Sequence, residues 1–242
     1  MSVRIAMWSG PRNLSTALMR SFENRADCTV SDEPFYAAYL AETGLDHPLR
    51  AEVLASQLTD WRVVAAELTG PAPGGAPLWY QKHMTHHMLP EFGRDWIDQC
   101  RNAFLIRDPA RVLASYVRSR EHVALADIGL VQQSELFDRV ADHLGHAPPV
   151  IDAADVLADP GRTLSALCTA LNIAFDPAML SWPAGKRTSD GVWAPAWYAS
   201  VEASTGFAAP GESGAMAKLP AHLAEIAAQA AEHFHRLAEY RL

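Results

Sequence analysis

The chain has 242 residues, of which 49% are hydrophobic, and it carries a formal net charge of −8 at neutral pH. This length fits one domain with room for an insertion, and the acidic balance argues against a nucleic-acid polymer as a partner. No apolar run reaches the roughly 18 residues of a membrane span, and the first residues lack a secretory signal. Three widely spaced cysteines, Cys28, Cys100 and Cys168, argue against a disulfide framework and favour the cytoplasm.

Short apolar runs alternate along the chain with stretches of helical spacing. In chain order, strands are expected at 3–8, 28–31, 78–82, 102–106 and 149–151. Helices are expected at about 13–24, 35–69, from 109 onward, at 160–171 and at 215–240. The second helical stretch is broken near Gly44 and Pro48, and a Gly- and Pro-rich loop follows it at 70–77.

This alternation predicts an α/β fold with a parallel sheet of about five strands and helices on both faces. Residues 1–242 are expected to form a single domain. The helical stretch at about 35–70 is expected to be an insertion on the substrate side. The C-terminal helix at about 215–240 is expected to pack on the domain or to support a dimer, so a monomer and a homodimer both remain open. Ligands of such sheets bind beyond the carboxyl ends of the strands.

The turn after the first strand has the features of an anion site. It reads Ser-Gly-Pro-Arg-Asn-Leu-Ser-Thr over residues 9–16 and joins a strand to a helix N-terminus, where free N–H groups and the helix dipole favour an anion. Ser15 and Thr16 offer hydroxyl donors, and Arg12 offers a charge-assisted bond. An ordinary capped helix, with Asn13 or Ser15 as the cap, explains the same pattern. The turn lacks the Gly-Lys-Ser/Thr ending of a Walker A motif.

A second anion signal lies at the end of the fourth expected strand. Arg107 follows the apolar run 102–106, and Ser115 lies eight positions later in a helix that begins near Pro109. Arginine offers a planar fork to a phosphate, and a helical serine two turns later reaches the same group. The alternative is that Arg107 pairs with a surface carboxylate and Ser115 only packs.

Together the two segments resemble the sulfotransferase superfamily, in particular a divergent bacterial-type branch that uses 3′-phosphoadenosine 5′-phosphosulfate. The first turn is similar to the family's Pro-Lys/Arg-Ser-Gly-Thr-Thr loop, with Asn13 and Leu14 in place of Ser-Gly. The Arg107 segment is similar to the family's 3′-phosphate segment. The resemblance implies a P-loop NTPase-like fold and a phosphosulfate donor as co-substrate. It implies donor binding by Arg12, Asn13, Leu14, Ser15, Thr16, Arg107 and Ser115.

Two further matches are looser. Residues 150–173 are similar to a family segment in which a strand, an Asp-Pro pair and a helix follow one another. Residues 185–193 are similar to the family's late basic, Gly-rich loop, which implies that Lys186 and Arg187 contact the 3′-phosphate. Solvated surface charges explain Lys186 and Arg187 equally well.

The resemblance offers two candidates for the base that deprotonates the acceptor. Glu33 lies in a Glu-Pro segment after the second strand, where several branches carry a catalytic Glu, although Glu-Pro also starts helices. His83 follows Lys82 directly, whereas the cytosolic branch has one residue between its Lys and its catalytic His. Neutral imidazole is a competent base near neutral pH. Lys82 is expected to touch the sulfonate or the acceptor, and Arg12 to stabilise the leaving group as a permanent cation.

Two clusters have less specific explanations. His83 and His87 are four residues apart, but no third ligand with zinc-site spacing flanks them, so no metal is expected. Trp193, Tyr198 and Phe207 belong to a late aromatic segment that suits either core packing or the wall of an adenine or acceptor pocket.

The favoured function is therefore that of a sulfotransferase acting on a hydroxyl or amine of a small-molecule acceptor. One alternative is a P-loop kinase-like enzyme that uses a nucleoside triphosphate. The absence of the P-loop lysine argues against this alternative. The other is a catalytically inactive nucleotide-binding protein of the same fold, which Leu14 and the register of His83 keep open.

Overall fold

A five-stranded sheet forms the centre of the computed structural model, which describes residues 2–116, 123–207 and 219–242. The strand order is β2-β3-β1-β4-β5, and every neighbouring pair is parallel. The strands are β1 (Val3–Ser9), β2 (Cys28–Asp32), β3 (Leu78–Met84), β4 (Arg101–Ile106) and β5 (Val150–Asp152). The predicted parallel α/β sheet is confirmed.

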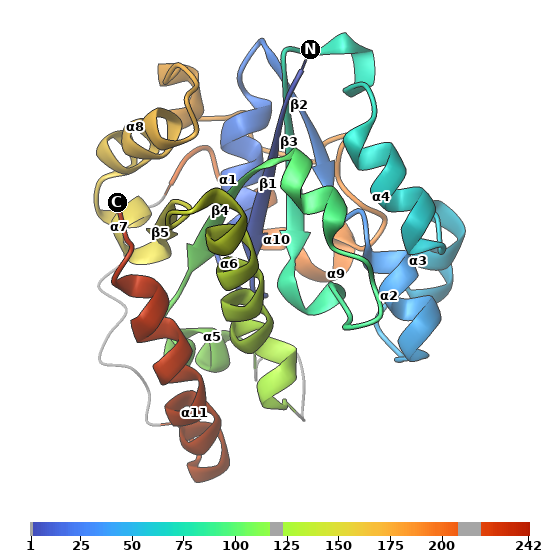
Figure 1. Ribbon diagram of the computed structural model, residues 1–242. Helices are drawn as coiled ribbons and strands as arrows, with labels where there is room; N and C mark the ends of the chain where they lie inside the picture. Colours follow the sequence, from blue (N-terminus) through green and yellow to red (C-terminus); the bar gives the residue numbers. More distant parts are fainter. Residues whose placement is uncertain (1, 117–122, 208–218) are drawn as a thin grey trace.

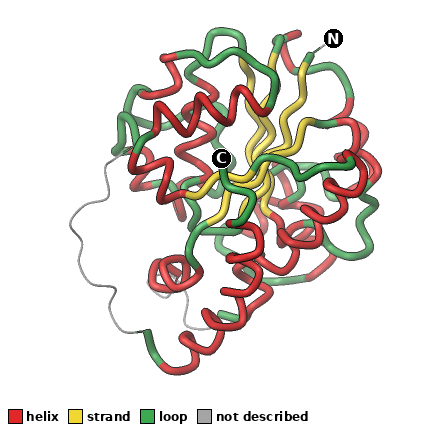
Figure 2. The backbone as a smooth tube through the Cα atoms, turned by 60° about the vertical axis from the view of Figure 1, so that its left-hand side comes forward, coloured by secondary structure: helices red, strands yellow, loops and turns green. Residues whose placement is uncertain are grey.

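Helices cover both faces of the sheet, as Figures 1 and 2 show. Side chains of β1 alternate between the two layers: Ile5 and Met7 pack with α1 and α8, and Ala6 and Trp8 pack with α4, α6 and α11. The helices before β4 are α1 (Ser15–Glu23), α2 (Tyr36–Thr43), α3 (Arg50–Ser56) and α4 (Trp61–Thr69). Those after it are α5 (Pro109–Tyr116), α6 (Leu130–Leu144), α7 (Ala153–Ala158), α8 (Pro160–Ala170), α9 (Ala194–Trp197), α10 (Ala199–Glu202) and α11 (Ala221–Ala238).

The structure refines several expected boundaries. The stretch between β2 and β3 contains three separate helices, α2 to α4. Gly44 and Leu49 adopt positive φ on the two sides of the break between α2 and α3. Between α3 and α4 the backbone becomes extended at Gln57, and the Asp60 side chain caps the start of α4. Strand β3 extends two residues beyond the expected end, to Met84. Helix α11 packs against α5 and α6 near the C-terminus, and its expected start at 215–218 lies outside the described residues. No helix of the described chain combines the length and hydrophobicity that a membrane crossing requires.

Parallel pairing brings the functional segments to one edge. The carboxyl ends of β1, β2, β3 and β4 lead into the segments that begin at Gly10, Glu33, Thr85 and Arg107. Register pairs Asp32 with Lys82 and Ser9 with both Met84 and Leu105. Strand β1 therefore separates a β2–β3 half of this edge from a β4–β5 half.

Candidate functional site

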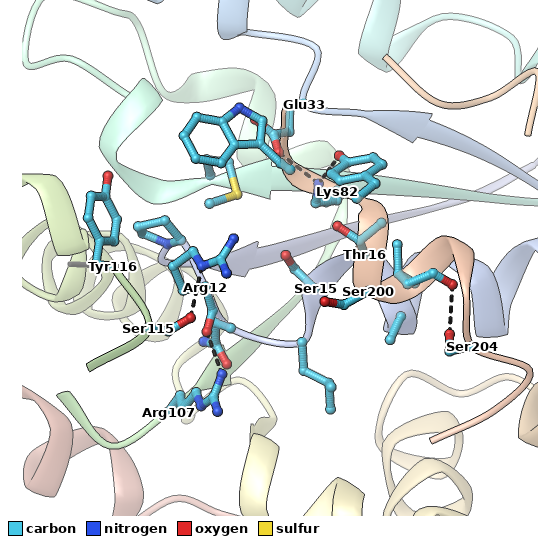
Figure 3. A pocket seen from close by; sticks show the side chains of 18 of the residues that line it. Arg12, Ser15, Thr16, Glu33, Lys82, Arg107, Ser115, Tyr116, Ser200 and Ser204 are labelled. Carbon is cyan, nitrogen blue, oxygen red and sulfur yellow. Dashed lines mark hydrogen bonds and ion pairs between the residues drawn. The ribbon is translucent and has the colours of Figure 1, made fainter. Parts of the chain in front are cut away.

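A cavity of about 430 Å³ opens at the carboxyl edge of the sheet. Its walls come from the turn after β1, the starts of the segments after β2 and β3, the Arg107 segment and the α9–α10 region. Figure 3 shows Arg12, Arg107 and Ser115 on one side, and Glu33 with Lys82 on another. The sequence-predicted residues Arg12, Asn13, Leu14, Ser15, Thr16, Glu33, Lys82, Arg107 and Ser115 all line it.

The turn after β1 presents an open helix N-terminus to the cavity. Leu14 is the N-cap residue of α1, and no side chain caps the helix. The first N–H groups of a helix have no intrahelical partner, and here the first turn of α1, with Ser15 and Thr16, lines the cavity. Arg12 and Leu14 have φ values of 56° and 44°, so the backbone is left-handed at both positions. Such turns form concave anion sites, and at Leu14 a residue with a Cβ occupies a conformation that glycine adopts most readily.

Asn13 anchors this turn to the sheet. Its Nδ2 donates a 2.7 Å hydrogen bond to the carbonyl oxygen of Leu105, at the end of β4. Gln133 of α6 donates to the same carbonyl at 2.9 Å and to that of Trp8 at 3.2 Å. The Asn13 bond ties the loop to the end of β4, and the two Gln133 bonds tie α6 to the ends of β1 and β4. Asn13 therefore acts through its side chain as a structural anchor.

The side chains of Arg12 and Arg107 lie next to each other beside this turn. Arg107 Nη1 donates to the carbonyl oxygen of Arg12 at 2.6 Å, and Arg12 Nε donates to Ser115 Oγ at 3.0 Å. Burial, followed by the charges of Arg111 and Arg12, lowers the pKa of Arg107. Within the described residues neither Arg12 nor Arg107 forms an ion pair with a carboxylate. Two adjacent cations without a counter-ion favour an anionic ligand with at least one phosphate-like group.

Lys82 lies at the centre of a buried polar network. Its Nζ donates to Asp32 Oδ1 at 2.8 Å, to Glu33 Oε1 at 2.7 Å and to the hydroxyl of Tyr198 at 2.6 Å. Tyr198 in turn donates to Asp32 Oδ2 at 2.7 Å and accepts from Trp193 Nε1 at 3.0 Å. All three hydrogens of the ammonium group are thereby used, which fixes its position.

The charges in this network shift one another's pKa values. Burial lowers the pKa of Lys82, but the carboxylates of Asp32 and Glu33 outweigh burial and raise it well above its usual value. Burial raises the pKa of Glu33, and the Lys82 charge opposes that rise without cancelling it. Lys82 is thus a permanent cation, and Glu33 is a cavity-lining carboxylate that is more basic than usual.

His83 lies in the core and not in the cavity. It is 2% exposed and stacks on Trp8 with ring centroids 4.6 Å apart, while Trp96 lies 5.2 Å away. Burial lowers its pKa to about 3, so the ring is neutral. Because β3 continues through residue 83, His83 points to the opposite face of the sheet from Lys82. The structure therefore contradicts the placement of His83 among the groups that contact substrate.

Lys186 and Arg187 also lie outside the cavity lining. Arg187 Nη2 donates to the carbonyl oxygen of Pro183 at 2.9 Å, and its backbone N–H donates to Asp190 at 2.8 Å. Asp190 also pairs with the buried Arg20 of α1 at 2.6 Å. These contacts hold the loop against α1, outside the set of residues that line the cavity with Arg107 and Ser115.

The remaining site residues are the late aromatic side chains and Asp32. Trp197, Tyr198 and Phe207 line the cavity, whereas Trp193 is buried in the core beneath them. Sequence reasoning missed the role of Asp32, although an acidic residue directly before Glu33 was a visible signal. It also left the Tyr198 hydroxyl unassigned, because its charged partners Lys82 and Asp32 lie 116 and 166 residues away along the chain. Among the described residues no cluster of three His, Cys, Asp or Glu side chains is arranged to hold a metal ion.

Comparisons with known proteins show what this chain resembles. The family model "Sulfotransferase domain" matches residues 3–236. Two Arabidopsis thaliana proteins, branched-chain-amino-acid aminotransferase-like proteins 1 and 2, are 38% and 36% identical over 206 residues. That alignment covers 85% of this chain but only 37% and 36% of the relatives, so the chain spans about a third of their length.

Solved structures with the same fold include two bacterial sulfotransferases. The Alicyclobacillus acidocaldarius sulfotransferase matches with a TM-score of 0.60 at 12% identity, covering 100% of this chain and 98% of that one. The sulfotransferase domain of the Synechococcus PCC 7002 olefin synthase matches with a TM-score of 0.56 at 20% identity, covering 97% and 95%. These likenesses confirm the P-loop-like α/β fold. With the match to the family model over nearly its whole length, the chain belongs to the sulfotransferase domain family.

Proposed function

We propose that this chain transfers a sulfuryl group from 3′-phosphoadenosine 5′-phosphosulfate to a small-molecule acceptor. The observation that carries the proposal is the cluster of Arg12, Arg107 and Ser115 beside the uncapped N-terminus of α1. This cluster offers two cations and no carboxylate within the described chain, which suits a ligand with phosphates at two positions.

The donor's two anionic ends would bind different segments. The turn of residues 11–16 would hold the 5′-phosphosulfate through the backbone of α1, the hydroxyls of Ser15 and Thr16, and Arg12. Arg107 and Ser115 would hold the 3′-phosphate. Leu14, Leu157 and Phe207 add apolar surface to the same cavity, which suits the adenine ring.

Glu33 is the proposed general base. It lines the cavity, and burial raises its pKa, so it accepts a proton more readily than an exposed carboxylate. As Glu33 takes the acceptor's proton, the acceptor atom forms a bond to sulfur, and the bond between sulfur and the bridging phosphate oxygen breaks. The leaving phosphate keeps that electron pair, and Arg12 stabilises its charge. Lys82 is proposed to orient Glu33 and to face the transferring group.

Nucleotide binding gives the direct test. We expect isothermal titration to detect 3′-phosphoadenosine 5′-phosphate and to show weaker binding of AMP. Replacing Arg107 by Ala should weaken binding of the bisphosphate by about 10- to 100-fold, the usual range for a charge-assisted bond. Arg162→Ala is the matched control, because Arg162 is exposed, does not line the cavity and is not among the charges that shift the pKa of Arg107. Equal affinity for AMP and the bisphosphate would remove the basis of the proposal.

Transfer chemistry is tested separately with isotopically labelled donor. Incorporation of label into an acceptor, without added magnesium, supports the sulfotransferase. Magnesium-dependent ATP turnover would favour the kinase-like alternative, and bisphosphate binding without any transfer would favour an inactive binding protein. A small-molecule acceptor, a cytoplasmic location, a single-domain organisation and a monomer or homodimer remain part of the proposal.

A further inference from the structure

The loop of residues 185–193 has no role in the proposed transfer, yet it joins helix α1 to the buried Asp32. The backbone N–H of Gly191 donates to Asp32 Oδ2 at 3.1 Å. Asp32 is 7% exposed and accepts further bonds from Lys82 and from the Tyr198 hydroxyl. Within the described chain the loop therefore supplies one of three donors that hold the carboxylate behind Lys82.

A buried ion pair fixes this loop to α1. Asp190 Oδ1 lies 2.6 Å from Nη2 of Arg20, and the two side chains are 5% and 1% exposed. Asp190 also accepts the backbone N–H of Arg187 at 2.8 Å, so its carboxylate joins the helix to the turn of its own loop. Ser189 adds a hydrogen bond to Glu23, which lies three residues after Arg20 in α1. Removing one partner of a buried pair leaves the other charge uncompensated, so the position of Asp190 is strongly determined.

Gly191 is packed too closely to carry a side chain. A Cβ at this position would collide with the indole ring of Trp193. Trp193 is 1% exposed, and its Nε1 donates to the hydroxyl of Tyr198 at 3.0 Å. That hydroxyl contacts both Asp32 and Lys82. The loop thus reaches the polar network by two routes, the N–H of Gly191 and the indole of Trp193, and their close packing links the two routes.

These contacts continue from the loop to the proposed base. Asp32 accepts a hydrogen bond from Lys82 at 2.8 Å, and Lys82 donates to Glu33 at 2.7 Å. Helix α1 begins at Ser15, which lines the same cavity as Glu33 (Figure 3), and Arg20 lies five residues later in that helix. One helix therefore carries both the proposed donor site and the anchor of the contacts that end at Glu33.

We infer that Asp190 and Gly191 are positioning residues that hold the base, Glu33, in a fixed place relative to the donor end of α1. They act through Asp32 and Lys82, and neither of them lines the cavity. The inference rests on the proposed function for the role of Glu33, whereas the contacts that carry it do not depend on the reaction. An in-line transfer needs its base close to the acceptor atom, and a misplacement of about 1 Å can cost roughly 100-fold in rate.

An NMR titration of the Glu33 carboxyl tests these contacts without an acceptor. In protein that carries carbon-13-labelled glutamate, the Glu33→Gln variant identifies the signal of this carboxyl. Burial raises the pKa of Glu33, and the Lys82 charge lowers it more strongly than the Asp32 charge raises it. The Tyr198 hydroxyl also lowers this pKa through a hydrogen bond. A change that loosens the contacts behind Lys82 should therefore shift the titration midpoint to higher pH.

Asp190→Ala and Gly191→Ala should both shift the Glu33 midpoint to higher pH. The first variant removes the partner of Arg20, and the second displaces the packed indole while the ion pair stays. Asp190→Asn keeps an oxygen for Arg20, so its shift should be smaller than that of Asp190→Ala. Gly161→Ala is the matched control, because a Cβ at Gly161 meets only an ordinary contact at 3.6 Å and this residue does not line the cavity.

Affinity for 3′-phosphoadenosine 5′-phosphate, measured by isothermal titration, shows whether the donor site of each variant is intact. It should stay within about twofold of the wild-type value, since none of the changed residues lines the cavity. An unmoved Glu33 midpoint in either alanine variant of the loop overturns the inference. A downward shift, which entry of water would cause, also overturns it, as does loss of bisphosphate binding in both variants, because each result would mean general damage. Failure of the wild-type protein to bind the bisphosphate rejects the proposed function and leaves the titration to decide the inference.

Discussion

Lys82 Nζ lies 2.7 Å from Glu33 Oε1, and the two side chains come from adjacent strand ends of the sheet. The pair is buried on the lysine side, where Lys82 is 1% exposed, and open on the glutamate side, where Glu33 lines the cavity. Asp32 neutralises much of the lysine charge from behind. Glu33 thus keeps one contact that orients it and an environment that favours uptake of a proton.

Glu33→Gln should abolish most transfer and leave bisphosphate binding intact. The amide keeps the shape of the side chain but cannot accept a proton as a base, so turnover should fall by about 10²- to 10⁴-fold. In the wild-type protein the raised pKa of Glu33 places the acidic limb of the rate profile above the usual glutamate range. Steady-state rates as a function of pH measure this. A variant that retains near-normal turnover would show that another group is the base.

Tyr198→Phe should lower both stability and turnover. Removing the hydroxyl takes one partner each from Lys82, Asp32 and Trp193, and a buried unpaired polar group costs about 1–3 kcal/mol. Urea unfolding measures the loss of stability, and turnover reports the altered position of Lys82. Tyr240→Phe is the matched control, because Tyr240 is exposed near the C-terminus. Equal behaviour of the two variants would show that the Tyr198 hydroxyl does not support the network.

The left-handed backbone at Leu14 gives a prediction about stability. Leu14→Gly and Leu14→Ala both remove the leucine side chain, but only alanine must keep a Cβ at a φ of 44°. We expect the Gly variant to be more stable than the Ala variant by about 1 kcal/mol in urea unfolding, the reverse of their usual order. An Ala variant of equal or greater stability would mean that this conformation carries no strain.

His83 should make the protein sensitive to acid. Its pKa is about 3 in the folded chain, far below the unfolded value, so the unfolded chain binds more protons once the pH falls below that unfolded value. Stability is thus present at neutral pH and is lost as the pH falls toward the folded-state pKa. Between pH 7 and pH 5 the loss from this group is about 2 kcal/mol. His83→Phe should reduce the loss in urea unfolding at these two pH values, whereas an unchanged difference would contradict the buried neutral ring.

Much of the fold followed from local patterns. The five apolar runs became the five strands, and the carboxyl ends of parallel strands necessarily share one edge, which is why Arg12, Arg107 and Ser115 meet. Helix α6 was not predicted from the sequence, in part because its buried face includes the polar Gln133. The side-chain amide of Gln133 donates hydrogen bonds to two strand carbonyls.

Side-chain direction was harder to foresee. The extension of β3 by two residues turned His83 into a strand residue, and a shift of one position in a strand reverses the face. The places of Lys186 and Arg187 depend on the contact between Arg20 and Asp190, which are 170 residues apart. No local pattern encodes that contact. The same holds for Tyr198 and Asp32, whose bond joins segments 166 residues apart.

The central position of β1 has an evolutionary consequence. Because β1 separates β3 from β4, Tyr36, His86 and His87 line the cavity from the β2–β3 half of the sheet, and Arg107 and Ser115 line it from the other half. Mutations in α2, α3 and the turn after β3 can therefore change the residues that line the cavity near Glu33, while Arg107 and Ser115 stay the same. Selection can change the residues of the β2–β3 half while it conserves those of the β4–β5 half.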